Sequence, residues 1–344
     1  MTSGEALRTP SLIVPRQGGS DVLTVEEREV RAPGPGQVRV KVAAMGVNFI
    51  EIYQRGGVYP MPTPFVLGAE GAGTVESVGE SVGESVGEGA GFAVGDHVAW
   101  CQGPGTGAGY VTLPAEKVVP VPDGVDLETA AAAMLQGITA HYLVNSTYAV
   151  QPGDTVLAHA VAGGVGQLLV QLVKAKGATL IGTAGSAAKV AIGRDLGADH
   201  VIDYSQLGDL TGPAGLADRV KELNGGQGVH VVYDGVGRST FDASLASLRP
   251  RGMMVLFGGA SGQVPPFDIQ RLNSSGSLFL TRPTMVHYLL TRDELEWRTS
   301  EILGAVASGE LKVAIGARYP LSEAAAAYDA LEGRRTTGKV LLIP

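Results

Sequence analysis

The chain is poor in cysteine and has no concentration of basic residues. Cys101 is the single cysteine among 344 residues, which excludes an intramolecular disulfide and is typical of a reducing compartment. There are 26 Lys and Arg against 34 Asp and Glu, a formal charge of −8, and no Lys/Arg-rich run is present. Because nucleic acids and anionic membranes select for basic surfaces, we expect neither as a partner.

Long hydrophobic runs and targeting signals are also missing. The longest apolar stretches are interrupted well short of the ~18–20 residues that a membrane span needs. The first residues have neither the basic start nor the apolar core of a signal peptide. We therefore expect a cytoplasmic protein that does not span a membrane.

Several familiar catalytic motifs are absent. The sequence contains no Ser/His/Asp nucleophile elbow, no HExxH and no phosphate-binding P-loop. The six histidines show no ligand spacing, and we interpret all of them as structural. They stand at positions 97, 141, 159, 200, 230 and 287.

Glycine is abundant, and its placement indicates two kinds of domain. The 50 glycines fall in clusters between apolar runs, and the length of the chain favours two domains. In the first third, β-branched alternation between Gly/Pro turns predicts a mostly β domain. The predicted strands lie within 11–45 and at 73–78, 96–100 and 110–122.

After a predicted helix at 127–143, strands and helices alternate. Continuous apolar strands that alternate with helices indicate a parallel sheet covered on both faces. A helix at 294–308 and a strand at 339–343 follow, and we expect this last strand to rejoin the first domain. The alternating strands are predicted at 155–159, 180–183, 200–204, 229–234, 253–257 and 278–281, and the helices at 164–176, 187–196, 216–223 and 240–248.

The strongest local signal is the segment 155–166, TVLAHAVAGGVG. An apolar strand runs directly into A-x-x-G-x-x-G, which opens a helix. Small residues there let the backbone approach a pyrophosphate, while the helix N-terminus supplies N–H donors. The strand–turn–helix context, followed by further βα units, predicts a dinucleotide site.

Taken together with other segments, this motif resembles the quinone oxidoreductase (zeta-crystallin-like) branch of the zinc-free medium-chain dehydrogenases/reductases. The resemblance covers nearly the whole chain. The segments that carry it are QGITA (136–140), GVNFIEIY (46–53), LGAEGAG (67–73), YDGVG (233–237), GSLFLTRP (276–283) and the C-terminal 338–344.

The resemblance implies an α/β fold: a GroES-like β domain plus a Rossmann doubly wound parallel-sheet domain. The GroES-like catalytic domain would comprise residues 1–137 and 286–344, and the NADPH-binding Rossmann domain residues 138–285. It also implies an active site between the domains and a homodimer whose Rossmann sheets join edge to edge near residues 278–281.

A tandem ESVG repeat departs from the family pattern. It occupies residues 76–87 and is about two repeats longer than the usual turn. A period of four residues matches no solenoid, so we predict a lengthened surface hairpin loop remote from the cofactor.

The resemblance to the zinc-free branch also argues against a bound zinc ion. Zinc-dependent relatives place a cysteine at the position of Asn48 and a histidine at that of Ala69, and they carry a four-cysteine lobe that is absent here. Neither Glu70 alone nor the lone Cys101 completes a ligand set, so we predict no metal. Glu70 is expected to hold structure and Cys101 to be a packed side chain.

The cofactor preference follows from the loop 183–189, TAGSAAK. NAD-selective sites carry an acid about 20 residues past the motif, whereas this chain has none before Asp195. Ser186 is a predicted N-cap, and Lys189 stands where a capping box favours Glu or Gln. A cation there costs ~0.3–1 kcal/mol unless a bound 2′-phosphate reverses the preference. The alternative is a solvated lysine.

The resemblance supplies further candidate residues. It implies that Asn48 and Tyr53 hydrogen-bond to the nicotinamide ribose or a substrate oxygen; alone, they would be a helix-start residue and a core aromatic. Around the 2′-phosphate it adds Tyr204 and Arg334, with Arg335 as an alternative to the latter. The other cofactor-binding residues that it implies are Gln136, Thr139, Tyr142, Ala162, Gly163, Gly164, Val165, Gly166 and Phe257.

These observations predict an NADPH-dependent reductase of quinones or related conjugated carbonyls. Hydride transfer needs mainly that cofactor and acceptor be held in near-attack geometry. A site without an evident acid suits a quinone, which takes its proton from water. An enoyl-type reductase of an activated C=C bond and a non-catalytic NADPH-binding protein remain the alternatives.

Overall fold

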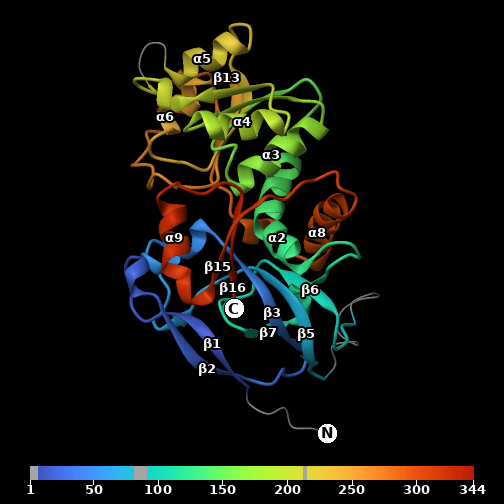
Figure 1. The fold of residues 1–344 in the computed structure, drawn as a ribbon. Helices are drawn as coiled ribbons and strands as arrows, with labels where there is room; N and C mark the ends of the chain where they lie inside the picture. The colour runs from blue at the N-terminus through green and yellow to red at the C-terminus, as the bar shows by residue number, and fades with distance from the viewer. Residues whose placement is uncertain (1–6, 81–90, 212–214) are drawn as a thin grey trace. The chain divides into compact units, whose positions relative to one another are not determined.

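The computed structural model describes residues 7–80, 91–211 and 215–344. They form two compact units (Figure 1). Unit 1 comprises Met1–Gln136 and Thr291–Pro344, and unit 2 comprises Gly137–Leu290. The helix α2 (Leu127–Tyr142) contributes to both.

Unit 1 is built on two β-sheets. A 7-stranded sheet has the order β15-β16-β3-β5-β6-β8, with β7 also paired to β3, and a 3-stranded sheet has the order β2-β1-β4. Val38, Val40 and Val42 alternate along β3 and pack with Trp100 and Leu113 in one buried cluster. The strands are β1 (Leu7–Val14), β2 (Thr24–Val30), β3 (Gln37–Val47), β4 (Phe65–Val66), β5 (Gly71–Val78), β6 (His97–Trp100), β7 (Tyr110–Pro114), β8 (Val119–Pro120), β15 (Ile315–Pro320) and β16 (Lys339–Ile343).

The last strand of the chain lies in the larger sheet of unit 1. Strand β16 pairs antiparallel with β3, with Leu341 opposite Gly46, so the final strand rejoins the first sheet as predicted. Figure 1 shows the red strand β16 beside the blue strand β3. The helices of this unit are α1 (Phe49–Arg55), α8 (Arg292–Ala307) and α9 (Ala324–Glu332).

Unit 2 is a parallel six-stranded sheet with the order β11-β10-β9-β12-β13-β14. Numbered from β9, this order is 3-2-1-4-5-6, which confirms the predicted doubly wound Rossmann arrangement. The strands are β9 (Thr155–Ala158), β10 (Thr179–Ala184), β11 (His200–Asp203), β12 (Val229–Asp234), β13 (Leu248–Leu256) and β14 (Phe279–Thr281), and the helices are α3 (Gly164–Ala175), α4 (Ala187–Asp195), α5 (Leu216–Leu223), α6 (Phe241–Ala246) and α7 (Gln270–Ser274).

Some predicted elements differ from the observed ones. The strand expected at 110–122 ends at Pro114, and a 3-10 turn (Ala115–Lys117) separates it from β8. The helix expected at 240–248 is only α6, and β13 begins at Leu248 rather than at 253. Of the ESVG repeat, Glu76 lies in β5 and pairs with Arg39 at 2.6 Å, while residues 81–87 lie outside the described residues.

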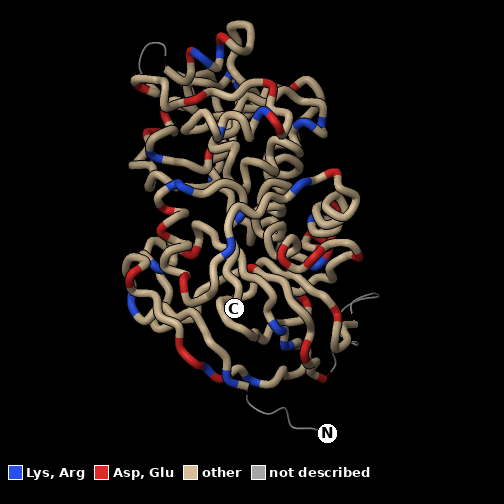
Figure 2. Tube along the Cα trace, viewed as in Figure 1, with Lys and Arg blue, Asp and Glu red and all other residues tan. Residues whose placement is uncertain are grey.

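Charged residues of both signs are interspersed over each unit (Figure 2). Within the described residues, none of the helices has the length and apolarity required to cross a bilayer.

Candidate functional site

The glycine motif of unit 2 forms the turn between β9 and α3. Ala160 adopts a left-handed backbone conformation with φ 55°, and Gly163 is the N-cap of α3. A Cβ on Gly166 would overlap the carbonyl oxygen of Ala160, so only glycine lets the helix start this close to the strand. The first N–H groups of a helix lack intrahelical acceptors, so this turn presents donors suited to an anion.

The turn lies at the topological switch point of the sheet. Strands β10 and β12 flank β9 on opposite sides, and the chain leaves β9 and β12 toward opposite sheet edges. In doubly wound folds the ligand crevice opens outside the carboxyl ends of the strands at this point. Ala162 is buried, whereas Gly163, Gly164 and Val165 are partly accessible.

The segment after β10 carries the predicted N-cap Ser186 and Lys189, and it packs against Tyr204, which was predicted with Lys189 for the 2′-phosphate. Ser186 caps α4, and its Oγ accepts from the Lys189 N–H at 3.4 Å, which confirms the predicted N-cap. Lys189 is half-buried at the third helical position. Tyr204 packs over Gly185, where a Cβ would lie 2.5 Å from the tyrosine hydroxyl oxygen. The structure therefore brings Ser186, Lys189 and Tyr204 to one place.

Phe257 lies at the end of β13 beside the end of β12. Its N–H donates to the Asp234 carbonyl at 2.9 Å, and its half-buried ring contacts Gly235, where a Cβ would lie 2.8 Å away. The ring therefore stands beside the loop that follows β12.

Helix α2 carries Gln136, Thr139 and Tyr142. Gln136 is partly exposed, and Thr139 is 7% exposed. The Tyr142 ring stacks on Tyr288 with centroids 4.3 Å apart and is 2% exposed. Tyr142 thus packs inside unit 2, and little of its surface is open to a ligand.

In unit 1, Asn48 belongs to a buried polar cluster. Its Nδ2 donates to Glu70 Oε1 at 2.7 Å and to the Gly46 carbonyl at 3.2 Å, and its Oδ1 accepts from Lys339 Nζ at 2.7 Å. Glu70 also pairs with Lys339 and accepts from the Leu135 N–H at 2.6 Å. Each polar atom of the Asn48 amide is therefore already engaged.

Glu51 is the second acid of this cluster and is fully buried. It accepts from the Asn48 N–H at 2.5 Å and lies 3.4 Å from the Tyr328 hydroxyl. Burial raises the pKa of Glu51 to about 8, although Lys339 and the Asn48 hydrogen bonds oppose the rise. Glu51, Lys339 and Tyr328 were not predicted as site residues. Lys339 and Tyr328 lie far along the chain and meet Asn48 and Glu51 only in the fold.

Tyr53 projects from α1 into an aromatic group. Its ring lies 6.3 Å from Phe49 and 5.5 Å, edge to face, from Tyr59. Tyr53 is half-buried, and Tyr59 is 40% exposed. Tyr59, which was not predicted as a site residue, gives this group an accessible aromatic surface. Its N–H donates to the Tyr53 carbonyl at 3.0 Å.

Arg334 belongs to unit 1 and follows α9. It has a left-handed backbone with φ 55° and an exposed side chain. Its neighbour Arg335 donates to the Asp329 carbonyl at 3.1 Å, so Arg335 is engaged at the end of α9.

The described residues form no cluster of metal ligands. Among residues 7–80, 91–211 and 215–344, no three His, Cys, Asp or Glu side chains gather in a way that could bind a metal. Cys101 is 2% exposed, and burial raises the pKa of its thiol, as expected for a packed residue. Glu70 serves the internal contacts given above.

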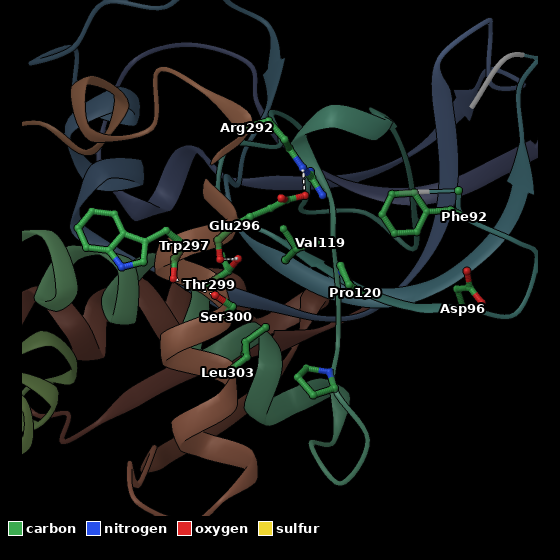
Figure 3. A pocket seen from close by; sticks show the side chains of 12 residues that line it. Phe92, Asp96, Val119, Pro120, Arg292, Glu296, Trp297, Thr299, Ser300 and Leu303 are labelled. Carbon is green, nitrogen blue, oxygen red and sulfur yellow. Dashed lines mark hydrogen bonds and ion pairs between the residues drawn. The ribbon is translucent and has the colours of Figure 1, made fainter. Parts of the chain in front are cut away.

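A separate groove of about 520 Å³ lies in unit 1 between α8 and the β6–β8 region (Figure 3). Arg292 crosses one side of it, pairs with Glu296 at 2.6 Å and donates to the Val118 carbonyl at 2.7 Å. Phe92, Val119 and Trp297 supply apolar surface. None of the predicted site residues lines this groove.

Comparisons with known proteins agree with this geometry. Residues 34–123 match the family model for the alcohol dehydrogenase GroES-like domain, and residues 164–303 match the model for zinc-binding dehydrogenases. A quinone oxidoreductase of Pseudomonas aeruginosa is 44% identical over 95% of this chain and 97% of its own length.

Two further proteins are similar to this chain over nearly its whole length. A 2-haloacrylate reductase of a Burkholderia species is 41% identical over 96% of this chain and 98% of its own. The structure of Escherichia coli quinone oxidoreductase complexed with NADPH superposes with a TM-score of 0.91 at 39% identity, covering 97% of this chain and 100% of that one.

Proposed function

Because the chain belongs to the quinone oxidoreductase branch of the medium-chain dehydrogenase/reductase superfamily, we propose that it is an NADPH-dependent reductase of quinones or related conjugated carbonyls. When bound, NADPH supplies a hydride to the electron-poor acceptor, and a proton from water completes the hydroquinone. The observation that carries this proposal is the glycine turn at the switch point of unit 2, in a chain 44% identical to a quinone oxidoreductase.

The residues of unit 2 fit a dinucleotide. The turn 162–166 and the first N–H groups of α3 would hold the pyrophosphate, since their N–H groups are unpaired within the helix. Thr139 and Phe257 would bound the nicotinamide, with Tyr142 supporting from α2. Gln136, which the resemblance also implies, is the last α2 residue of unit 1. Because Tyr142 is stacked on Tyr288, it would shape the pocket rather than donate to the ligand.

The preference for NADPH rests on the loop after β10. Ser186 and Lys189 belong to this loop and Tyr204 packs against its Gly185, where NAD-selective sites carry an acid, and we propose that the Lys189 ammonium reaches the phosphate. An ammonium group that reaches a phosphate is stabilised by a charge-assisted hydrogen bond. The resemblance also implies Arg334, an exposed cation after α9, as a candidate for this phosphate.

In unit 1 we assign Asn48 and Tyr53 different roles. The Asn48 amide is engaged by Glu70 and Lys339, so it would act as a positioning residue that fixes the start of α1. Tyr53 lies on that helix and would offer its hydroxyl and ring to the acceptor. The exposed ring of Tyr59 extends this aromatic surface, which suits a flat conjugated substrate.

We further propose that catalysis needs no zinc. The positions of two ligands in zinc-dependent relatives are held by Asn48 and Ala69, and the Lys339 ammonium supplies a buried positive charge beside Glu70. A cation already paired with Glu70 leaves that carboxylate no free charge to bind a metal.

A homodimer is also proposed. Strand β14 ends the sheet of unit 2 and, among the strands of the described residues, pairs with β13 alone, so its other edge can pair with a second copy. Phe279 on this strand is 57% exposed. Light scattering of wild type and of Leu280→Pro tests the dimer, which requires an intact β14 edge.

We place the protein in the cytoplasm because its composition suits a reducing compartment.

Reduction of an activated C=C bond is the second candidate. It is favoured by the 2-haloacrylate reductase relative, whose identity of 41% is close to that of the quinone oxidoreductases. Both reactions need hydride delivery to an electron-poor carbon or its conjugated oxygen.

One assay tests the proposal. Purified protein is mixed with NADPH and a panel of quinones and enones, and the nicotinamide absorbance is followed. Rapid oxidation with quinones supports the main function, and oxidation only with enones supports the second. Tight NADPH binding without any turnover would contradict both and favour a non-catalytic role.

A further inference from the structure

His159 follows β9 directly and lies under the glycine turn. The residue is 3% exposed, and both ring nitrogens have partners. Nδ1 lies 3.0 Å from Thr183 Oγ1 at the end of β10, and Nε2 lies 2.8 Å from Ser244 Oγ in α6. The ring therefore bridges segments on both sides of the central strand.

The direction of these hydrogen bonds follows from the buried carboxylate of Asp234. Its Oδ1 accepts from the N–H groups of Val236 and Gly237 at 2.8 and 3.0 Å. Its Oδ2 accepts from the hydroxyls of Thr240 and Ser244 at 2.7 and 2.8 Å. A hydroxyl has one proton, so Ser244, which donates to Asp234, must accept from His159. Nε2 is therefore the protonated ring nitrogen.

The role of Nδ1 follows from the charge of the ring. The Ala160 N–H donates to Thr183 Oγ1 at 3.4 Å, and the Thr183 hydroxyl keeps its own proton, which can point at His159 Nδ1. A neutral ring carries a single N–H, already placed on Nε2, so Nδ1 accepts from Thr183. Burial lowers the pKa of His159, and the more distant Asp234 only partly opposes this, which agrees with a neutral ring. One continuous chain of hydrogen bonds, each donating toward the next residue, thus runs from the Ala160 N–H through Thr183, His159 and Ser244 to the Asp234 carboxylate.

This chain connects the three loops that the proposed cofactor would contact. Ala160 begins the glycine turn, Thr183 precedes the segment that leads to Ser186 and Lys189, and the Asp234 carbonyl accepts from the Phe257 N–H. The chain of hydrogen bonds starts at Ala160, whose backbone is left-handed, a conformation that a non-glycine residue adopts only at a cost in free energy.

We infer that His159, as the neutral Nε2–H tautomer, is a positioning residue that holds the three loops of the dinucleotide cradle in register. The inference rests on the proposed NADPH function. His159 does not touch the cofactor; it acts through Thr183 and Ser244. Its replacement therefore weakens cofactor binding without removing a cofactor contact.

A binding measurement separates this role from simple core packing. In His159→Leu, the NADPH dissociation constant, measured by fluorescence titration, should rise about tenfold or more, as for one lost hydrogen bond in a preorganised site. The matched control is Thr155→Val, which removes a 3.0 Å hydrogen bond to Asn224 at the other end of β9. Its NADPH affinity should change less than about twofold because the lesion lies away from the loops.

Two conservative variants refine the test. The oxygen of Asn reaches the place of Nδ1 and can keep the Thr183 link, whereas the nitrogen of Gln reaches the place of Nε2 and keeps only the Ser244 link. Because Thr183 also accepts from the Ala160 N–H of the glycine turn, the link that Asn keeps acts closer to the cofactor loops, and His159→Asn should retain more NADPH affinity than His159→Gln. If His159→Leu and Thr155→Val weaken NADPH equally, or if neither does, the positioning role is wrong.

A measurement on the unaltered protein requires neither a variant nor cofactor. Long-range proton–nitrogen NMR spectra of ¹⁵N-histidine-labelled protein should show His159 as the neutral Nε2–H tautomer. An imidazolium or an Nδ1–H tautomer near pH 7 would overturn the inference. Failure of the wild type to bind NADPH would instead overturn the proposed function, while the tautomer would still decide whether the chain of hydrogen bonds exists.

Discussion

Removal of the Lys189 side chain tests the basis of cofactor choice. Lys189 stands in the first turn of α4. The Lys189 N–H donates to the side chain of the N-cap Ser186, and Tyr204 packs beside Gly185 just before the helix. A single charge-assisted hydrogen bond contributes ~1.5–3 kcal/mol, which corresponds to ~10–150-fold in affinity. In Lys189→Ala, we therefore expect the KM and the dissociation constant for NADPH to rise at least about tenfold, with those for NADH almost unchanged.

The control for this variant is Arg194→Ala. Arg194 is an exposed cation in the last turn of the same helix, so its removal changes the net charge equally but leaves the Ser186 segment intact. Steady-state kinetics and fluorescence titration with both cofactors, at fixed ionic strength, give the comparison. Equal weakening of NADPH and NADH by Lys189→Ala, an equal effect of Arg194→Ala, or a wild type that prefers NADH would refute the reasoning.

Three further predictions concern unit 1. Burial raises the folded-state pKa of Glu51 to about 8 from 4.5, so stability falls as pH rises between these values because the unfolded chain releases its proton first. In Glu51→Gln, this contribution, up to about 1.4 kcal/mol per pH unit, should vanish from urea-unfolding free energies; profiles that run parallel to wild type would contradict it. Chelator treatment should leave activity intact, and elemental analysis should find no stoichiometric zinc; a full equivalent lost together with activity would sink the claim. Deletion of residues 80–87 should leave turnover nearly unchanged, whereas a large loss in a folded variant would mean that the insertion shapes the site.

Much of unit 2 could be predicted because its signals are local. Strand β12 lies at the predicted 229–234, and α3 and α4 each end within one residue of the prediction, because apolar runs and glycine turns mark these elements in the sequence itself. The Ser186 cap was predicted for the same reason. Helix α6 ends at Ala246 rather than at residue 248 because Leu248 already belongs to β13, where it pairs with Val229 of β12.

The contacts that build the polar cluster could not be read from the sequence. Lys339 and Asn48 are separated by 291 positions in the sequence, and no local sequence pattern predicts such a contact. The same limit applies to His159, which we interpreted as structural because its spacing shows no ligand pattern. Its partners Thr183 and Ser244 come from β10 and α6, and only the fold shows that they connect the cofactor loops. The elements α1, α9 and β15 were not assigned from the sequence either, being short segments outside the regular strand–helix alternation.

The central claim is hydride transfer from bound NADPH to a quinone. The most direct measurement is single-turnover oxidation of NADPH that carries deuterium on one or the other face of nicotinamide C4, with a simple quinone in excess. Because the cradle would fix one face toward the acceptor, the account predicts slower oxidation for one label only. Equal rates for both labels, or no oxidation of bound NADPH by any quinone, would contradict it.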